Sequence, residues 1–319
     1  MDRLIKSFFV AMACLTLFLS AGCGGEEEQA SGPETNPEFE KDTAMAFSQG
    51  KDQVLKFSAI PGTNNSELNE KLSPLAQYLT DELGVQVQFV PAPNYVGAIA
   101  LFLHNEIQFA WFGGLTGVQA RHKLPGALAI AQGVEDPNYF SYFIAHKDSG
   151  IPAWNGEDDQ PFPMAMQGKA FTFGSPSSTS GRLMPEHFVT QLADKSPESF
   201  FEEVHFSGAH DATVKLVNTG RYQVGAVDYK TYERMKAAGD AADCIIIWKT
   251  PLYADYNLTV RGDLDETYGE GSIARLQEVL IAIDDPELLL GFDRSSLIAA
   301  GNTDFQAIAD LAKELDFLE

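Results

Sequence analysis

The sequence predicts an α/β protein of two lobes, each a mainly parallel sheet flanked by helices. Stretches with the composition of strands alternate with stretches whose apolar residues recur at helical spacing. This alternation occurs once before residue 150 and again after it. The chain has 319 residues, of which 45% are hydrophobic, so it holds enough apolar mass for two compact cores.

The first half of the folded region opens with a strand-like run from Val54 to Pro61, where the proline ends the pairing. The patterns that follow predict helix 68–83, strand 85–90, helix 95–103 and strand 107–112. In sheets of this kind, ligands bind beyond the carboxyl ends of the strands. We therefore expect binding residues close to residues 59–62, 92–95 and 111–116.

The second half repeats this alternation. Its predicted elements are strand 169–173, helix 184–193, strand 204–206, helix 212–217, strand 222–227 and strand 244–248. Segments 142–148 and 250–255 are candidate crossings between the lobes, and the leucine-rich stretches after Arg261 return to the first lobe. We expect lobe 1 at residues 53–145 and 253–319, and lobe 2 at residues 146–252.

The N-terminus has the parts of a secretory signal. Arg3 and Lys6 precede an apolar run over residues 8–19, and small residues separate this run from Cys23. The run is shorter than the roughly 17–25 residues of a membrane-spanning helix. We predict a signal peptide at residues 1–22. Its end resembles the lipobox of bacterial lipoproteins, which implies a lipid anchor on Cys23; a plain cleaved signal is the alternative.

Residues 23–52 are rich in Gly, Glu, Ser, Pro and Asn. Such a composition buries little apolar surface, so we predict a flexible tether. Cys244 is then the only cysteine of the folded region, which excludes an intrachain disulfide there. It opens an apolar run, and this position favours a buried strand thiol.

Charge and motifs exclude several classes of protein. The net charge of −23 argues against binding nucleic acid or an anionic membrane surface, because both require a basic face. The sequence lacks the G-x-S-x-G motif of serine hydrolases, so we expect no enzyme. His205 and His210 do not have the spacing of metal ligands on a helix, and we expect no metal or other cofactor.

The turn after strand 169–173 carries the most informative residues. Five hydroxyl side chains and two glycines lie between Gly174 and Gly181. Hydroxyls and free backbone N–H groups at a strand-to-helix turn can hold an anion without a lysine. The alternative is an ordinary helix cap or surface turn, where serine and threonine are common.

Five segments carry a specific resemblance: FSAIPGTNNSEL, FAWFGGLTGVQAR, FTFGSPSSTSGRLMPEHF, FSGAHDATVKLV and WKTPLYADYNLTVRGDL. They resemble the substrate-binding proteins of ABC importers for phosphonate, phosphite and related oxyanions, including a branch often labelled putative selenate-binding. The resemblance implies the fold of type II periplasmic binding proteins. It also implies a monomer at the periplasmic or extracellular face of the cell envelope, with an ABC permease and ATPase as partners.

The resemblance also implies ligand-binding residues. Its serine-threonine-serine cradle corresponds to Ser178, Thr179 and Ser180. The cleft histidine of the family corresponds to His210, and its hinge-side aspartate to Asp255. Its aromatic residue after the second strand corresponds to Tyr95, and its second aromatic residue to Phe112. An acidic residue that contacts amino groups in the family corresponds to Asp228. Phe112 stands where phosphonate binders have tyrosine, so the identical phosphonate ligand is in doubt.

Asp255 narrows the expected ligand. A carboxylate repels a fully ionised guest but accepts a hydrogen bond from a protonated one. Monoanions of phosphite, phosphonate and phosphate carry an O–H group near neutral pH, whereas selenate and sulfate do not. We therefore expect a phosphorus oxyanion for import. The alternatives are a selenate-like or sulfate-like anion, and a sensor subunit that serves a signalling kinase.

Overall fold

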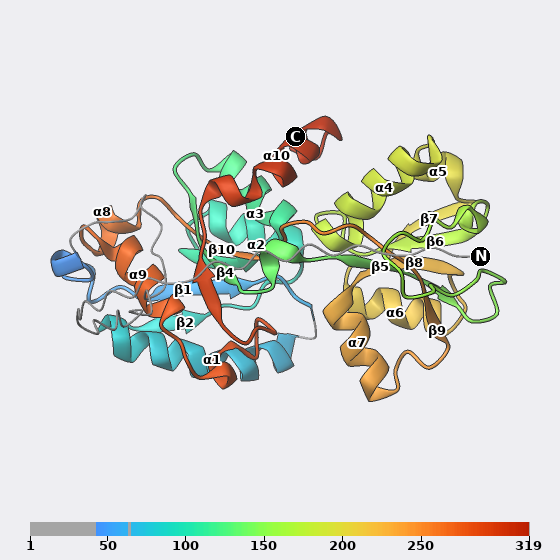
Figure 1. Cartoon of the computed structure of the whole chain (residues 1–319). Coiled ribbons are helices and arrows are strands. Elements are labelled where there is room, and N and C mark those ends of the chain that lie inside the picture. Colours follow the sequence, from blue (N-terminus) through green and yellow to red (C-terminus); the bar gives the residue numbers. More distant parts are fainter. Residues whose placement is uncertain (1–42, 63–64, 319) are drawn as a thin grey trace, which may run out of the picture. The chain divides into compact units, whose positions relative to one another are not determined.

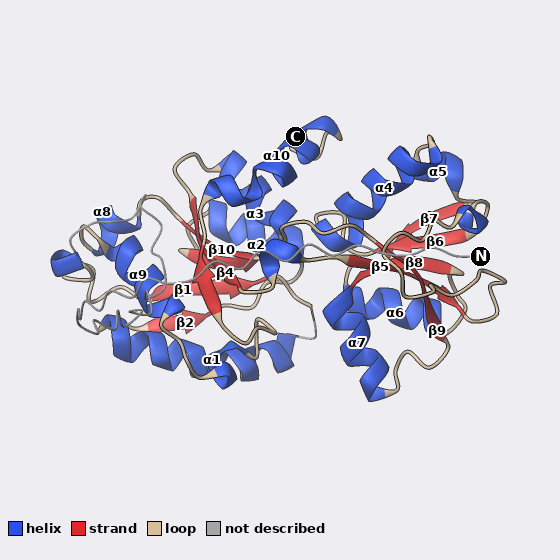
Figure 2. Cartoon of the chain, viewed as in Figure 1, coloured by secondary structure: helices blue, strands red, loops and turns tan. Residues whose placement is uncertain are grey.

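The structure is a computed structural model that describes residues 43–62 and 65–318 (Figure 1). The predicted signal peptide, the lipidation site Cys23 and the first part of the predicted tether lie outside these residues. Within them, no helix is both long and apolar enough to cross a membrane. Two sheets, each with helices on its faces, form the framework of the described chain (Figure 2).

The first sheet has the strand order β2-β1-β3-β10-β4-β11. Its strands are β1 (Leu55–Ala59), β2 (Val87–Phe89), β3 (Phe109–Phe112), β4 (Leu128–Gly133), β10 (Asn257–Val260) and β11 (Leu297–Ala299). β1 pairs in parallel with β2 and β3, while β10 runs antiparallel to β3 and β4. Apolar side chains from β1 and β3 pack with helices α1 and α9 in one core, so this sheet has a buried face.

The second sheet has the order β7-β6-β8-β5-β9. Its strands are β5 (Ser141–His146), β6 (Ala170–Phe173), β7 (Glu203–Phe206), β8 (Val224–Asp228) and β9 (Cys244–Lys249). β6 pairs in parallel with β7 and β8, and β5 lies antiparallel between β8 and β9. The β8 run Val224–Asp228 is fully buried, as expected for an inner strand covered on both faces.

Helices cover both faces of each sheet. The longer ones are α1 (Asn65–Leu83), α2 (Tyr95–Leu103), α3 (Gly114–Lys123), α4 (Met184–Ala193), α6 (His210–Asn218), α7 (Tyr229–Ala238), α9 (Ser272–Ile281) and α10 (Gln306–Glu314). Shorter helical segments are η2 (Thr43–Met45), η3 (Asp136–Asn138), η4 (Met164–Met166), η5 (Thr179–Leu183), α5 (Pro197–Phe200), α8 (Leu264–Tyr268), η6 (Pro286–Leu289) and η7 (Asn302–Phe305). At the second sheet, α4 and α5 lie on one face and α6 and α7 on the other (Figure 2).

The predicted fold class is confirmed, but the sheets are mixed rather than mainly parallel. Most of the difference comes from the strands next to the crossings. β5 and β10 each enter a sheet directly from the other one, without an α-helix to reverse the chain, so they pair antiparallel with their neighbours. β11 adds one more antiparallel pair, with β4. Strand periodicity along the sequence gives no information on this direction.

One predicted crossing is confirmed and the other is wrong: segment 250–255 lies in the link between β9 and β10. Segment 142–148 was expected to link the lobes, but most of it is β5, a strand of the second sheet. The first link instead runs between the end of β4 and the start of β5, and the second between β9 and β10. The two links pair with each other through an isolated antiparallel bridge between Tyr139 and Tyr253.

The last part of the predicted tether is packed rather than flexible. Phe47 is only 4% exposed and lies in the first core, where its ring contacts that of Tyr268. Its backbone N–H donates to the Ser272 hydroxyl at 2.9 Å, and the N–H of Gln49 donates to the Tyr268 carbonyl. One buried aromatic ring with backbone hydrogen bonds orders this stretch, although its average composition is polar.

Candidate functional site

The starts of several helices meet around one small volume. Tyr95 is the first residue of α2, Gly114 of α3, Thr179 of the π-helical turn η5 that leads into α4, and His210 of α6. Asp228 is the N-cap of α7. Each helix start carries a partial positive charge of roughly +0.5 and unpaired N–H groups. The fold therefore concentrates positive dipole ends where the strands finish.

The hydroxyls of the serine turn are oriented as donors. Ser178 Oγ accepts the backbone N–H of Gly181 at 2.9 Å, and Thr179 Oγ1 accepts the backbone N–H of Leu115 at 2.9 Å. Because these oxygens already accept, their O–H groups are directed toward other acceptors. The Leu115 bond also joins α3, which covers the first sheet, to the turn that follows a strand of the second.

A glycine leaves room for close contacts inside this turn. A Cβ atom on Gly181 would lie 3.0 Å from both His210 Cε1 and Ser178 Oγ, and 3.2 Å from Gly174 Cα. The side chains of His210 and Ser178 lie on one side of Gly181, and the backbone of Gly174 lies on the other. Gly181 thus allows the imidazole to approach the serine turn, a role that the sequence pattern alone did not indicate.

Asp255 reaches the same volume from the second crossing. It is 1% exposed, and its Oδ1 atom accepts the backbone N–H of Gly114 at 2.8 Å. Its Oδ2 atom accepts no hydrogen bond from the described part of the chain. Burial raises the pKa of Asp255 to about 7, although the Gly114 N–H and the nearby hydroxyls of Thr179 and Ser180 oppose the shift. This carboxyl group therefore gains or loses its proton near neutral pH.

His210 and Asp228 complete the group. Nε2 of His210 lies 3.4 Å from the hydroxyl oxygens of both Ser178 and Ser180. On the other side of the ring, Nδ1 lies 3.4 Å from Oδ2 of Asp228. Both side chains are 2% exposed. A row of hydroxyl, imidazole and carboxylate thus connects the serine turn to the start of α7.

Of the predicted aromatic residues, Tyr95 lies next to this group. Burial and the nearby carboxylates of Asp228 and Asp255 raise the pKa of Tyr95, so its hydroxyl remains a donor. Phe112 is fully buried and packs edge-on against Phe102 in the core beside α2, which also contains Tyr95. The neighbouring strand residue Trp111 lines the pocket that adjoins the group.

A pocket adjoins the group at Tyr95 and Asp228. Trp111, which lies within the expected range 111–116, lines this pocket, and so do three residues that were not predicted from the sequence: Tyr139, Tyr256 and Arg294. Rings of Trp111 and Tyr256 stack with centroids 5.6 Å apart. The spacing of Tyr139 and Tyr256 in the sequence did not indicate that they line the same pocket as Trp111.

Arg294 is a charged residue that sequence reasoning missed. It is 5% exposed, and its guanidinium donates to the Asp136 carboxylate at 2.6 Å. The guanidinium carbon also lies 4.7 Å from the ring centre of Tyr256 and 5.3 Å from that of Tyr139. Arg294 thereby holds both crossings from the pocket side. Its charge is balanced by Asp136, which leaves anion binding to the dipoles.

Two arginines in the sequence motifs, Arg121 and Arg182, have other partners than this group. Arg121 donates to the side chains of Asn257 and Thr259, and Arg182 pairs with Glu186 at 2.6 Å.

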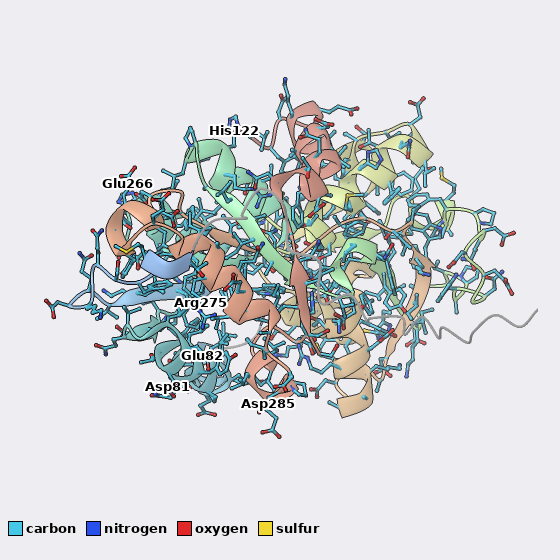
Figure 3. All side chains as sticks on the ribbon, turned by 60° about the vertical axis from the view of Figure 1, so that its left-hand side comes forward. Asp81, Glu82, His122, Glu266, Arg275 and Asp285 are labelled. Atoms are coloured by element: carbon cyan, nitrogen blue, oxygen red, sulfur yellow. The ribbon has the colours of Figure 1, made fainter. Side chains whose placement is uncertain are left out.

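Much of the negative charge is at the surface, where acidic side chains project into solvent: Asp81, Glu82, Glu266 and Asp285 (Figure 3). Salt screens these charges within roughly 8–10 Å, so the buried dipoles govern the site.

The described part of the chain matches a known family. A family model of periplasmic substrate-binding proteins of phosphonate ABC transporters matches residues 57–312. The chain belongs to this family. The match spans all the elements that supply Tyr95, the serine turn, His210, Asp228 and Asp255, and it confirms the family resemblance drawn from the sequence motifs.

Two proteins illustrate the similarity. A probable phosphite-binding ABC transporter protein of Prochlorococcus marinus, PhnD1, is 32% identical over 281 residues, which are 86% of this chain and 93% of the relative. Its structure, in complex with methylphosphonate, superposes with a TM-score of 0.76 over 83% of this chain and 98% of that one. A phosphate-import protein of Mycolicibacterium smegmatis is 27% identical over 256 residues, 76% of this chain and 73% of its own.

Proposed function

We propose that this chain captures a small, singly protonated phosphorus oxyanion (phosphite, a phosphonate or phosphate) and delivers it to the permease and ATPase of an ABC importer. The anion sits at Ser178, Thr179 and Ser180, with His210 and Tyr95 as further donors. The protein works as a monomer whose lobes close around the ligand. Family membership supports the transport role, and the site residues support the class of ligand.

The observation that carries the ligand class is the buried carboxyl group of Asp255. It lies among donors that suit an anion, yet it is itself an acceptor whose Oδ2 atom has no partner among the described residues. A protonated oxyanion offers one O–H group to such an atom, while a fully ionised anion is repelled. The pKa of about 7 for Asp255 lets the proton reside on either partner.

Dipoles supply the attraction that binding requires. The hydroxyls of the serine turn lie beside His210 at the start of α6, and the positive ends of α3 and α6 are near them. Hydrogen bonds to an ionised acceptor contribute about 1.5–3 kcal/mol each. Several such bonds in a site without water account for tight binding without a lysine or arginine in contact with the anion.

A panel of anions tests the ligand class. We expect phosphite, methylphosphonate and phosphate to raise the melting temperature, by about 5 °C or more at 100-fold excess over Kd, because ligand binding then adds about 2.7 kcal/mol. Sulfate and selenate should raise it much less at the same concentration. Calorimetry then ranks the affinities. Selenate or sulfate as the tightest ligand would show that the proton does not govern selection.

The selenate and sensor alternatives remain distinct outcomes. The selenate alternative rests on the label of a related branch, whereas Asp255 favours a protonated ligand. The sensor alternative shares the same site and differs only in the partner. Genes for an ATPase and a permease beside this one would support import, and a histidine kinase gene in that place would support sensing.

We also propose that Cys23 carries the lipid that anchors the chain. In bacteria that process lipoproteins, the full-length chain should be recovered in the membrane fraction, and its mature N-terminal peptide should have the mass of a lipidated cysteine. The C23S variant should lose both properties while binding the same anions. If the Cys23→Ser chain stays in the membrane fraction, a segment other than Cys23 anchors it.

We propose no catalysis, although Ser178, His210 and Asp228 follow one another as in serine hydrolases. The Ser178 hydroxyl accepts a backbone N–H at 2.9 Å and contacts the imidazole only at 3.4 Å, at the same distance as Ser180. Such an oxygen is placed to donate to an anion rather than to be activated. Bound methylphosphonate should accordingly be recovered chemically unchanged.

A further inference from the structure

Asp228 holds one oxygen free for His210. Its Oδ1 atom accepts the Tyr139 hydroxyl at 3.0 Å and the Thr231 backbone N–H at 2.9 Å. Its Oδ2 atom lies 3.4 Å from Nδ1 of His210 and accepts no hydrogen bond from the residues that the structure describes. Two donors thus fix the carboxylate so that its second oxygen faces the imidazole.

The contacts of the imidazole place a proton on Nε2. Nδ1 lies 3.3 Å from the backbone N–H of Asp228, a contact that requires a neutral ring whose proton is on Nε2. Nδ1 also lies close to Oδ2 of Asp228, a contact that a doubly protonated, charged ring satisfies. In both states, the Nε2–H group points at the hydroxyls of Ser178 and Ser180. The two states differ by one proton on Nδ1.

A charge on His210 is costly unless it is balanced. The ring is 2% exposed, and it stands at the first residue of α6, where the helix dipole is already positive. A carboxylate 3.4 Å away offsets both effects, because attraction between opposite charges is strong where water is excluded. Burial raises the pKa of Asp228, but His210, Thr231 and Tyr139 together bring it below its ordinary value, so the carboxylate is ionised.

The following inference rests on the proposed function. We propose that Asp228 is a positioning residue for anion recognition: it aims the Nε2–H of His210 at the bound oxyanion and stabilises a proton that Nδ1 takes from solvent when the anion binds. Asp228 acts through the imidazole rather than by touching the ligand. The acidic chain thereby gains one positive charge in the site only while the anion is present.

Other ionisable groups surround the pair and shape the experiment. The groups on and around α6 are Tyr95 and Asp255 across the serine turn, Asp211 paired with Lys215, Tyr142 bonded to Glu233, and Cys244 against the Val214 carbonyl. Because Asp255 has a pKa of about 7, proton uptake measured for the whole protein near neutral pH includes the proton of this carboxyl group. The readout must therefore report on the imidazole itself.

The D228N variant removes the charge and keeps the structure. An asparagine oxygen can still cap α7 by accepting the Thr231 N–H and can still accept the Tyr139 hydroxyl, so the variant should fold. We expect at least about tenfold weaker methylphosphonate binding at pH 7.5, which is about 1.4 kcal/mol. The loss should shrink toward pH 5.5, where the ring can be charged without Asp228.

A double-mutant cycle separates positioning from structure. H210Q should also weaken binding, and the D228N/H210Q double variant should bind no more weakly than H210Q alone, because Asp228 has nothing left to act on. A control variant, D211N, removes the carboxylate of the residue next to His210, which pairs with Lys215 at 3.0 Å and has no part in the site. It should bind methylphosphonate within about threefold of wild type, because this charge does not act on the imidazole.

Nitrogen-15 spectra of the imidazole report the proton directly. H210Q identifies the His210 signals among the six histidines of the chain. At pH 7.5, we expect a neutral ring protonated on Nε2 in the free wild type and a ring protonated on both nitrogens with saturating methylphosphonate. In D228N, the ring should stay neutral in the presence of the same ligand.

The outcomes distinguish this inference from the proposed function. A wild-type protein that binds none of the panel of anions overturns both. A wild-type protein that binds methylphosphonate while His210 stays neutral overturns the role of Asp228 alone. So do losses in D228N and H210Q that add together and do not change between pH 5.5 and pH 8.

Discussion

Replacing Ser178, Thr179 and Ser180 together by alanine should weaken phosphite and methylphosphonate binding by at least about 1,000-fold. Each hydroxyl donates one hydrogen bond to an ionised acceptor, which contributes about 1.5–3 kcal/mol, and every 1.4 kcal/mol is a factor of ten. Titration calorimetry measures the change. Affinity within tenfold of wild type would remove the serine turn from the site.

The stability of the triple variant needs its own measurement. The Ser178 hydroxyl accepts the Gly181 N–H, and the Thr179 hydroxyl accepts the Leu115 N–H, so their loss should cost about 1 kcal/mol each in unfolding free energy. Urea unfolding should show this cost while the far-ultraviolet spectrum stays unchanged. S175A serves as the control in the same turn and should change affinity by less than about threefold, because Ser175 is not part of the cradle.

The second large effect concerns Asp255 and pH. Its pKa is raised in the folded protein to about 7 from an ordinary value of 3.8. The folded state therefore binds the proton more tightly than the unfolded state. The stability that this contributes is present below pH 3.8 and is lost as the pH rises through about 7, a change of about 4 kcal/mol. The neutral amide of D255N cannot show this change.

Urea unfolding of the ligand-free protein at several pH values measures this pH-dependent change in stability. The difference in unfolding free energy, D255N minus wild type, should increase by roughly 4 kcal/mol between pH 4 and pH 8. The variant should also bind sulfate better relative to phosphite, because the repulsion is gone. A constant stability difference would mean that Asp255 titrates normally, and an unchanged sulfate-to-phosphite ratio would place it away from the ligand.

Most of the local structure followed from the sequence. Helices 95–103 and 184–193 begin and end where their patterns predicted, since apolar spacing and the residues at their ends are local properties. The predicted tether failed at Phe47, because composition averaged over thirty residues conceals a single buried ring. Phe112, assigned to the site from a family position, packs in the core that also contains Tyr95, and its neighbour Trp111 lines the adjoining pocket.

The sequence predicted most residues of the candidate site but not the contacts between them. Ser178, Thr179, Ser180, Tyr95 and His210 were singled out as residues at strand ends and helix starts, and the structure brings them together. Arg294 and Asp136 were not found, because neither lies in a motif. They are 158 residues apart in sequence, and no local pattern relates them.

By itself the sequence determined an α/β chain of this family, with a serine-rich turn after a strand and donors at helix starts. Tertiary structure alone decided which partners those donors have: Asp255 meets Gly114 across 141 residues, and Asp228 meets His210 across 18. The reason is physical. Propensity, capping and periodicity act over a few residues, whereas desolvation and pairing of charges depend on what packing brings within a few ångströms.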